Sequence, residues 1–193
     1  LKAIATDYEK AILSTSTAAA GSSSVGRQLT GLQKAIATNT AKGTGTGSSA
    51  IIQLTEDNVN LLMQKIWNQG GDPRALICGG HQKRVISKKF SAKTGFSFNI
   101  EASTRTAIAN INKYEGSFGT VDIIPDRFHM TNRISIITPE QIKIAVLRDI
   151  QQYKSGEVAS RVGGWVEAEM TLQFGNEKAH ARASYLKSSG TIA

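Results

Sequence analysis

The segment Val166–Phe174 constrains the fold most, because apolar and polar residues alternate along its whole length. A period of two sends successive side chains to opposite faces of a β-strand. One face carries Val166, Ala168, Met170, Leu172 and Phe174, and the other carries Glu167, Glu169, Thr171 and Gln173 together with the preceding Trp165. We predict a strand whose apolar face packs on a core and whose polar face meets solvent or a partner.

Other short strands are predicted before this one. Ile142–Leu147 alternates in the same way, and Ile134–Ile137 is a short apolar run. Gly119–Ile124 ends before Pro125, which cannot donate a hydrogen bond to a strand ladder. A further strand is predicted over Thr106–Asn112. With the helices described next, these strands indicate a mixed α+β protein.

The clearest helix is predicted over Glu56–Gln69. Thr55 is a good N-cap residue, and two acidic residues follow it in the first turn, where the helix dipole favours negative charge. The residues spaced for one buried stripe are Val59, Leu62, Met63, Ile66 and Trp67. After the glycines that end this helix, Ala75–Cys78 is predicted to be a buried strand and His81–Phe90 a second helix.

The first fifty residues alternate between ordered and Gly/Ser/Thr-rich segments. Lys2–Leu13 has the spacing of an amphipathic helix, and Ser14–Ser24 has the composition of a flexible loop. A short ordered segment is predicted over Val25–Thr38. Asn39–Ser49 is again Gly/Thr/Ser-rich, so we predict a linker there into a second part of the fold.

Composition excludes several classes of protein. The single cysteine of the 193 residues permits no internal disulfide and no multi-cysteine zinc site, and it fits a reducing compartment. No run approaches the roughly 20 apolar residues of a membrane helix, so no membrane span is expected. The net charge of +8 suggests a polyanionic neighbour, such as nucleic acid, although a basic charge can also serve solubility alone.

The basic charge is concentrated in one segment without acidic residues. Its members are Arg74, Lys83, Arg84, Lys88, Lys89 and Lys93. Three interpretations stay open: the cluster offsets the charge of DNA, it pairs with acidic residues of a neighbouring subunit, or it is a solvated face. Aromatic residues are few, so any contact with nucleic acid would be electrostatic and independent of sequence.

No motif predicts a catalytic, cofactor or metal site. Cys78 and His81 resemble a nucleophile with its base, but a cysteine in a buried strand usually serves as a small hydrophobe, which we favour. Gly43, Gly45 and Gly47 lack the Lys-Ser/Thr ending of a phosphate-binding loop. The histidines His81, His129 and His180 lack paired ligand spacing, and His180 is expected to be a structural hydrogen-bonding residue. The carboxylates of Glu167 and Glu169, on one strand face, are candidates for a subunit contact.

Four blocks of this sequence together resemble the major capsid proteins of tailed double-stranded DNA bacteriophages. The blocks are Leu54–Phe90; Tyr114–Phe128, with its Ser117–Thr120 and Pro125–Phe128 motifs; Ala145–Arg148 followed by Lys154–Glu157; and Glu169–Leu172 followed by Asn176–His180. Three positions depart from the family pattern. Asp149 stands where proline is usual, Gly175 where a charged residue is common, and Ala181 where glycine is common.

The resemblance implies the Hong Kong 97-type capsid fold, with a peripheral and an axial lobe. Residues 1–50 would form the first part of the peripheral lobe, with the end of the spine helix and a linker. Residues 51–145 would form the axial lobe, and residues 146–193 the second part of the peripheral lobe, with long C-terminal strands. The N-terminal arm and extended loop of such subunits would precede this chain, which would form the C-terminal two-thirds of the subunit.

The function implied is structural and not enzymatic. Identical copies would assemble into pentamers and hexamers of an icosahedral shell that encloses DNA, in a virion assembled in the bacterial cytoplasm. Scaffold, portal or decoration proteins are further expected partners, and no cofactor is expected. The alternatives are a cellular nanocompartment shell of the encapsulin type, a basic DNA-binding module and a cysteine hydrolase.

Overall fold

The computed structural model describes residues 2–42, 52–93, 111–156 and 163–188, and the described chain divides into two compact units. Unit 1 contains residues 1–34 and 140–175, and unit 2 contains residues 35–139 and 176–193. The expected strand over Thr106–Asn112 and the glycines Gly43, Gly45 and Gly47 fall wholly or mostly outside the described residues.

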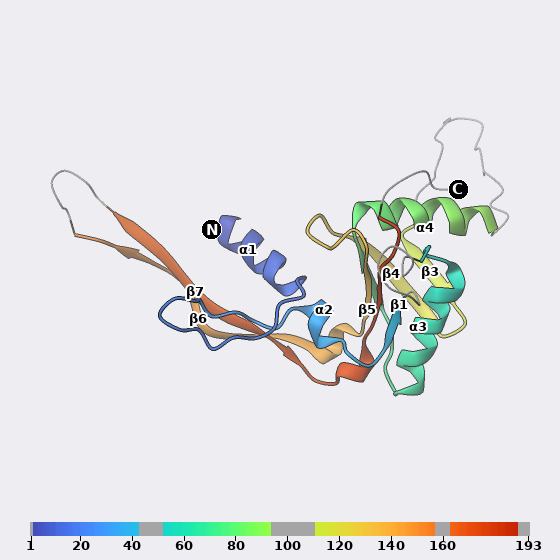
Figure 1. Cartoon of the computed structure of the whole chain (residues 1–193), viewed down its shortest axis with the longest axis horizontal. Helices are drawn as coiled ribbons and strands as arrows, with labels where there is room; N and C mark the ends of the chain where they lie inside the picture. The colour runs from blue at the N-terminus through green and yellow to red at the C-terminus, as the bar shows by residue number, and fades with distance from the viewer. Residues whose placement is uncertain (1, 43–51, 94–110, 157–162, 189–193) are drawn as a thin grey trace, which may run out of the picture. The chain divides into compact units, whose positions relative to one another are not determined.

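Unit 2 is built on a six-stranded mixed sheet with the strand order β1-β8-β5-β2-β4-β3. The strands are β1 (Thr40–Lys42), β2 (Ala75–Cys78), β3 (Lys113–Gly116), β4 (Gly119–Pro125), β5 (Ile134–Ile137) and β8 (Ala181–Ser184). β2 runs parallel to β4 and β1 parallel to β8, whereas the other neighbouring pairs are antiparallel. Chain segments far apart in sequence therefore meet in one sheet (Figure 1).

Helix α3 (Glu56–Asn68) forms as its sequence predicts. The Thr55 side chain accepts a hydrogen bond from the Asn58 backbone N–H, which satisfies one of the exposed donors of the first turn. The apolar stripe is buried at Val59, Leu62, Met63 and Ile66. Trp67, predicted to belong to it, is instead 60% exposed, and its ring packs against Phe118 at a centroid distance of 5.9 Å. Four of the five residues predicted for the buried stripe are therefore buried.

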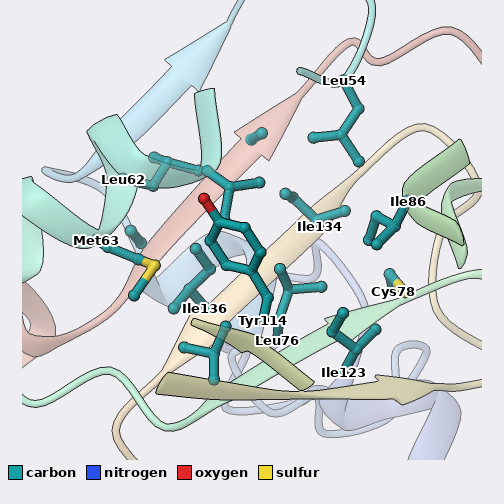
Figure 2. Packing of buried hydrophobic residues seen from close by; sticks show 14 of the residues in the cluster. Leu54, Leu62, Met63, Leu76, Cys78, Ile86, Tyr114, Ile123, Ile134 and Ile136 are labelled. Atoms are coloured by element: carbon teal, nitrogen blue, oxygen red, sulfur yellow. The ribbon is translucent and has the colours of Figure 1, made fainter. Parts of the chain in front are cut away.

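The core of unit 2 lies between the sheet and two helices. The side chains of α3 and of α4 (Gly80–Lys93) both join it, and they contact the face of the sheet that carries Leu76, Ile134 and Ile136. Figure 2 shows Leu62 and Met63 beside these strand residues, with Ile86 of α4 near Cys78. Burial of such side chains contributes about 1.5–3 kcal/mol each, so this cluster is the main source of stability in the unit.

The predicted linker over Asn39–Ser49 is wrong at its first residues. Thr40–Lys42 forms the edge strand β1, parallel to β8. The local composition could not predict this strand, because its partner strand lies about 140 residues later in the chain. The short helix α2 (Leu32–Ala35) precedes it, within the segment predicted to be ordered.

Unit 1 consists of helix α1 (Lys2–Ile12), an extended segment and a two-stranded antiparallel ribbon. The ribbon is formed by β6 (Ile142–Lys154) and β7 (Gly164–Phe174), and the 3₁₀ turn η2 (Pro139–Gln141) precedes it. A second 3₁₀ turn, η3 (Glu177–Ala179), follows the ribbon in unit 2. No described helix is long and apolar enough to cross a bilayer.

Candidate assembly surfaces

The ribbon β6–β7 exposes large apolar side chains. Ile144 is 57% exposed, Val146 54% and Leu147 74%, and Trp165 near the far end is 55% exposed. The Trp165 ring stacks on the Tyr153 ring at a centroid distance of 5.5 Å, and both rings remain partly exposed. Exposed apolar groups at this density usually mark a surface that another molecule covers.

One face of the ribbon is apolar. Ile144 pairs with Leu172 and Val146 with Met170, and residues directly opposite each other in antiparallel strands share a face. The prediction that this face of β7 packs on a core is wrong, because Val166 is 40% exposed and Met170 and Leu172 are only half-buried. A two-stranded sheet has no second layer of its own to cover either face.

Two irregularities interrupt the ribbon on the β6 side. The register shifts between Val146 and Arg148 and again between Arg148 and Gln151. Each bulge adds an unpaired residue, bends the strand and increases its twist. Asp149 lies in the second bulge, so the position where the capsid family usually has proline needs no ladder hydrogen bond here. The departure at Asp149 therefore falls where the bulge already interrupts the ladder.

The two glutamates of the ribbon have partners within their own chain. Glu167 forms an ion pair with Arg148, and Glu169 forms one with Arg27. Arg148 Nε also lies 3.5 Å from Glu169 Oε2. The hydrogen bond and charge of Glu167, with the charge of Glu169, raise the pKa of the Arg148 guanidinium. These charged residues come from β6, from β7 and from the segment before α2. Their ion pairs therefore hold Arg27 against the ribbon.

Helix α1 is attached to the same ribbon. The Tyr8 hydroxyl donates a 2.9 Å hydrogen bond to the Ala168 carbonyl oxygen. α1, the following segment and the ribbon surround an open groove of about 1130 Å³. Its wall contains apolar side chains such as Ile4 and Met170 as well as the charged side chains of Arg27 and Glu169. The groove thus includes residues of the apolar face, such as Val146 and Met170.

The predicted basic cluster lies largely on helix α4, but its members differ in environment. Arg84 and Lys88 are exposed. Lys83 donates to the Ile111 carbonyl oxygen, and burial lowers the pKa of its ammonium group against the opposing effect of Cys78. Lys89 Nζ lies 2.6 Å from Gln53 Oε1. Two of the helix lysines therefore already bind groups within the subunit.

The other two members of the cluster are Arg74, which does not lie on α4, and Lys93, whose side chain is not among the described residues. Arg74 precedes β2 and forms an ion pair with Asp72 at 2.6 Å. Lys93 ends α4, and its side chain lies outside the described residues. The structure thus does not gather the six basic residues into one unpaired patch.

The candidate nucleophile is a packing residue. Cys78 is fully buried in β2, and burial raises the pKa of its thiol to about 11, so the thiol is neutral at physiological pH. No hydrogen bond joins Cys78 to His81 in the described part of the chain. The preference for a small buried hydrophobe is confirmed.

The histidines take part in structural hydrogen bonds. The His129 ring nitrogens lie 3.1 Å from the Met130 carbonyl oxygen and 3.2 Å from Ser135 Oγ. His180 Nδ1 accepts a 3.2 Å hydrogen bond from the Thr138 backbone N–H, as expected for a structural histidine. Burial lowers the pKa of both rings. Across the described ranges, no three His, Cys, Asp or Glu side chains are grouped to hold a metal ion.

The second capsid-like block has a clear structural role. Gly116 pairs with Gly119 across a two-residue turn, and Gly119 has a φ of +122°, which favours glycine. A Cβ on Gly116 would lie 2.5 Å from Asn60 Oδ1, so glycine allows β3 to approach α3 closely. Phe118, in the turn, contacts Trp67. This motif therefore joins the β3–β4 turn to the helix.

The fourth block connects the residues just before β1 to the 3₁₀ turn η3, which precedes β8. One Glu177 carboxylate oxygen accepts hydrogen bonds from the Ala37 and Thr38 backbone N–H groups, at 2.7 and 2.6 Å, and the other accepts from the Thr38 hydroxyl at 3.0 Å. Asn39 Nδ2 donates to the Lys178 carbonyl oxygen at 2.6 Å. Burial alone would raise the pKa of Glu177, but these hydrogen bonds outweigh it and the pKa is lowered.

Sequence reasoning missed the arginine partners and the exposed part of β6. Arg27 lies 142 residues from Glu169 along the chain, and no local pattern connects them. A signal for β6 was present after Leu147, where apolar and charged residues mix without alternation. That mixture is typical of a bulged strand that packs on no single core.

Comparison with known proteins agrees with this architecture. A family profile described as SU10 major capsid protein matches residues 1–187. No curated protein sequence matches the chain. Among solved structures, a chain of the satellite phage P4 procapsid that includes the size determination (Sid) protein is similar, with 14% identity and a TM-score of 0.63. The alignment covers 100% of this chain and 62% of that one.

A second similar structure is the holo-SrpI encapsulin complex from Synechococcus elongatus PCC 7942, with 11% identity and a TM-score of 0.56. The alignment covers 83% of this chain and 58% of that chain, so this chain spans about three-fifths of the length of the shell proteins it resembles. Identities this low show a shared fold alone, whereas the profile match extends over nearly all of the sequence. The chain belongs to the SU10 major capsid protein family and has the Hong Kong 97-type capsid fold that its sequence predicted.

Proposed function

We propose that this chain is the shell-forming part of a bacteriophage major capsid subunit, which acts by self-assembly and not by catalysis. Copies associate into pentamers and hexamers of an icosahedral shell around double-stranded DNA. The family supports this role, and the observation that carries it is the uncovered apolar face of the β6–β7 ribbon. A single interface of standard size buries about 1,600 Å², and closed symmetry repeats each contact many times.

A pair of substitutions on that face tests the proposal. Ile144→Ser with Val146→Ser should leave the subunit folded by circular dichroism but reduce particle yield at least tenfold in negative-stain microscopy and sedimentation. The matched control is Lys143→Ser with Gln173→Ser, a register pair on the other face of the ribbon. Normal particles from the apolar-face variant, or a full-length protein that stays monomeric at high concentration, would refute the role of this surface.

We assign unit 2 to the axial lobe and unit 1 to the peripheral lobe. The compact units support boundaries different from those expected from sequence, since β1 and β8 complete the sheet of unit 2. Cross-linking across the capsomer axis tests the assignment. Pairs of cysteines introduced on unit 2 should cross-link subunits around the axis of a pentamer or hexamer. Pairs on the ribbon should instead cross-link subunits at the outer edge of the pentamer or hexamer.

The contact role of Glu167 and Glu169 is proposed on their partial exposure, and it needs a test that preserves the internal ion pairs. A charge swap at all four positions, Arg27→Glu, Arg148→Glu, Glu167→Arg and Glu169→Arg, keeps every opposite-charge pair within the unit but reverses the charges offered to a neighbour. Loss of particles from the swap supports a contact between subunits. Normal particles from the swap, with loss only in the single variants, would limit these residues to a role inside the chain.

Contact with packaged DNA is proposed for the exposed part of α4. Arg84 and Lys88 support it by their exposure and charge. Each lost phosphate contact lowers the slope of log affinity against log salt by about 0.9. Arg84→Gln with Lys88→Gln should therefore flatten the salt dependence of DNA retention by intact particles, compared with Lys34→Gln in unit 1. An unchanged slope would favour the solvated face.

The virion is the proposed location, with assembly in the bacterial cytoplasm. Scaffold, portal or decoration proteins are proposed partners of the complete particle. An encapsulin-type compartment is the second candidate, supported only by the shared fold. Mass spectrometry of purified particles separates the two, because nucleic acid within the shell supports the virus and an enzyme cargo supports the compartment.

A further inference from the structure

Two arginines on the sheet of unit 2 point to a binding site. Arg182 lies in β8 and Arg133 immediately precedes β5. In the antiparallel pairing of these strands, Ile134 is opposite Ala183 and Ser135 is opposite Arg182, so the next position along places Arg133 opposite Ser184. Figure 1 labels β1 and β5 of this sheet, and β8 lies between them in the strand order.

These polar residues share the face that the apolar core does not use. Ile134, Ile136, Ala181 and Ala183 are buried in the core. Alternation along the strands therefore sends Arg133, Ser135, Arg182 and Ser184 to the opposite face. Lys42 of β1, in register with Ser184, adds a third cation to this face. The strands β1, β5 and β8 contain no acidic residue.

Several buried donors here have no acceptor within the described chain. Nε and Nη1 of Arg133 and Nε of Arg182 are buried without a hydrogen-bond partner, as is Oγ of Ser184, a residue only 4% exposed. Neither arginine forms an ion pair in the described ranges. Leaving a buried donor unpaired costs about 1–3 kcal/mol, and more for a charged group, so such groups usually have a partner.

The two guanidinium groups also act on each other. Burial lowers the pKa of Arg182, and the like charge of Arg133 lowers it further. The neighbouring carboxylate Asp126, whose charge acts on His129, accepts a 2.7 Å hydrogen bond from the Phe128 backbone N–H. Two cations held together without a carboxylate between them would be stabilised by an anion that contacts both.

The geometry points to an oxyanion-binding site formed by Arg133, Arg182 and Ser184, with Lys42 at its edge. The guanidinium groups donate to the oxygens of a phosphate or carboxylate, which they bind in a planar, two-pronged manner. The oxyanion is supplied either by free inorganic phosphate or by a carboxylate of a second copy of the chain. The second source rests on the proposed assembly, whereas the site itself does not.

Thermal unfolding of the full-length, unassembled protein tests the site with inorganic phosphate as the probe. At pH 7 and matched ionic strength, 20 mM phosphate in place of chloride should raise Tm by about 3 °C, because a ligand that binds only the folded state stabilises it. Arg182→Gln and Arg133→Gln should each lose most of that rise. Arg127→Gln, which removes an exposed arginine from the nearby loop, should retain it.

Direct titration calorimetry with phosphate provides a measurement for any variant that folds poorly. The site would be overturned if the wild type showed neither phosphate binding nor a phosphate-specific rise in Tm, or if Arg127→Gln lost as much of that rise as the other variants.

Assembled particles then distinguish the two sources of the oxyanion. Phosphate that still binds in particles indicates a free ion. Particles that exclude phosphate, together with failure of Arg182→Gln to assemble, indicate a carboxylate of a neighbouring copy. Failure of the ribbon variants alone leaves this result unaffected.

Discussion

The substitution Glu177→Gln isolates the carboxylate that joins the start of β1 to η3. It preserves the size and shape of the side chain, removes the charge and replaces one acceptor oxygen by an NH2 donor. The backbone N–H groups of Ala37 and Thr38 would then donate to a neutral amide oxygen, and the Thr38 hydroxyl would lose the second oxygen as its acceptor. Glu115→Gln, on the exposed edge strand β3 of the same unit, makes the identical chemical change without these contacts.

The size of the effect follows from the three hydrogen bonds. A hydrogen bond to a charged group contributes about 1.5–3 kcal/mol and a neutral one about 1 kcal/mol. Because Glu177 is only half-buried, solvent screens each difference to roughly 0.5 kcal/mol. We therefore expect a loss of about 1.5 kcal/mol in the free energy of unfolding for Glu177→Gln, and less than about 0.5 kcal/mol for Glu115→Gln.

The effect must depend on pH in a defined direction. The folded-state pKa of Glu177 is lowered, so its carboxylate contributes stability above the unfolded-state pKa of about 4.3. That contribution is lost as the pH falls through the lower folded-state value. The difference between wild type and Glu177→Gln should be constant from pH 7 to pH 6 and should shrink below about pH 4.

Urea unfolding of the full-length, unassembled protein at several pH values measures both quantities. The slope of free energy against urea should be unchanged, which confines the effect to stability. Equal stability of the Glu177→Gln and Glu115→Gln variants at pH 7 would refute the reasoning. So would a difference that stays constant down to pH 3.5, since a packing defect does not titrate.

Three further outcomes are expected. Ile66→Ala, at a fully buried position of α3, should cost about 3 kcal/mol in urea unfolding, and a cost under 1 kcal/mol would contradict the assigned core. The Cys78 thiol, with its pKa near 11, should react with Ellman's reagent at pH 8 at least a hundredfold more slowly in the folded protein than in 6 M urea, and equal rates would show an accessible thiol. Gly31→Ala places a Cβ 2.2 Å from the Ser14 carbonyl oxygen and should destabilise unit 1 by about 2 kcal/mol, whereas Gly26→Ala has open space and should be neutral; equal proteolysis rates of the two variants would argue against this close approach.

Local signals in the sequence were sufficient for helix α3 and for the short strand β2. The Thr55 cap, the acidic first turn and the spacing of Val59, Leu62 and Ile66 depend only on nearby residues, so the pattern is complete within the segment. The four capsid-like blocks identified the family for a related reason. Their glycine and hydrogen-bonding residues occupy turns and close contacts that few other side chains fit.

Tertiary structure alone decided which apolar faces are covered. The alternation in Val166–Phe174 specified a strand with one apolar face, but it could not specify whether a core exists to receive that face. The exposure of Trp67, the strand β1 and the Arg27–Glu169 pair likewise depend on segments distant in the chain. A periodic pattern records how a segment divides its side chains between two faces, whereas burial depends on what the remaining chain, or another copy of it, places against them.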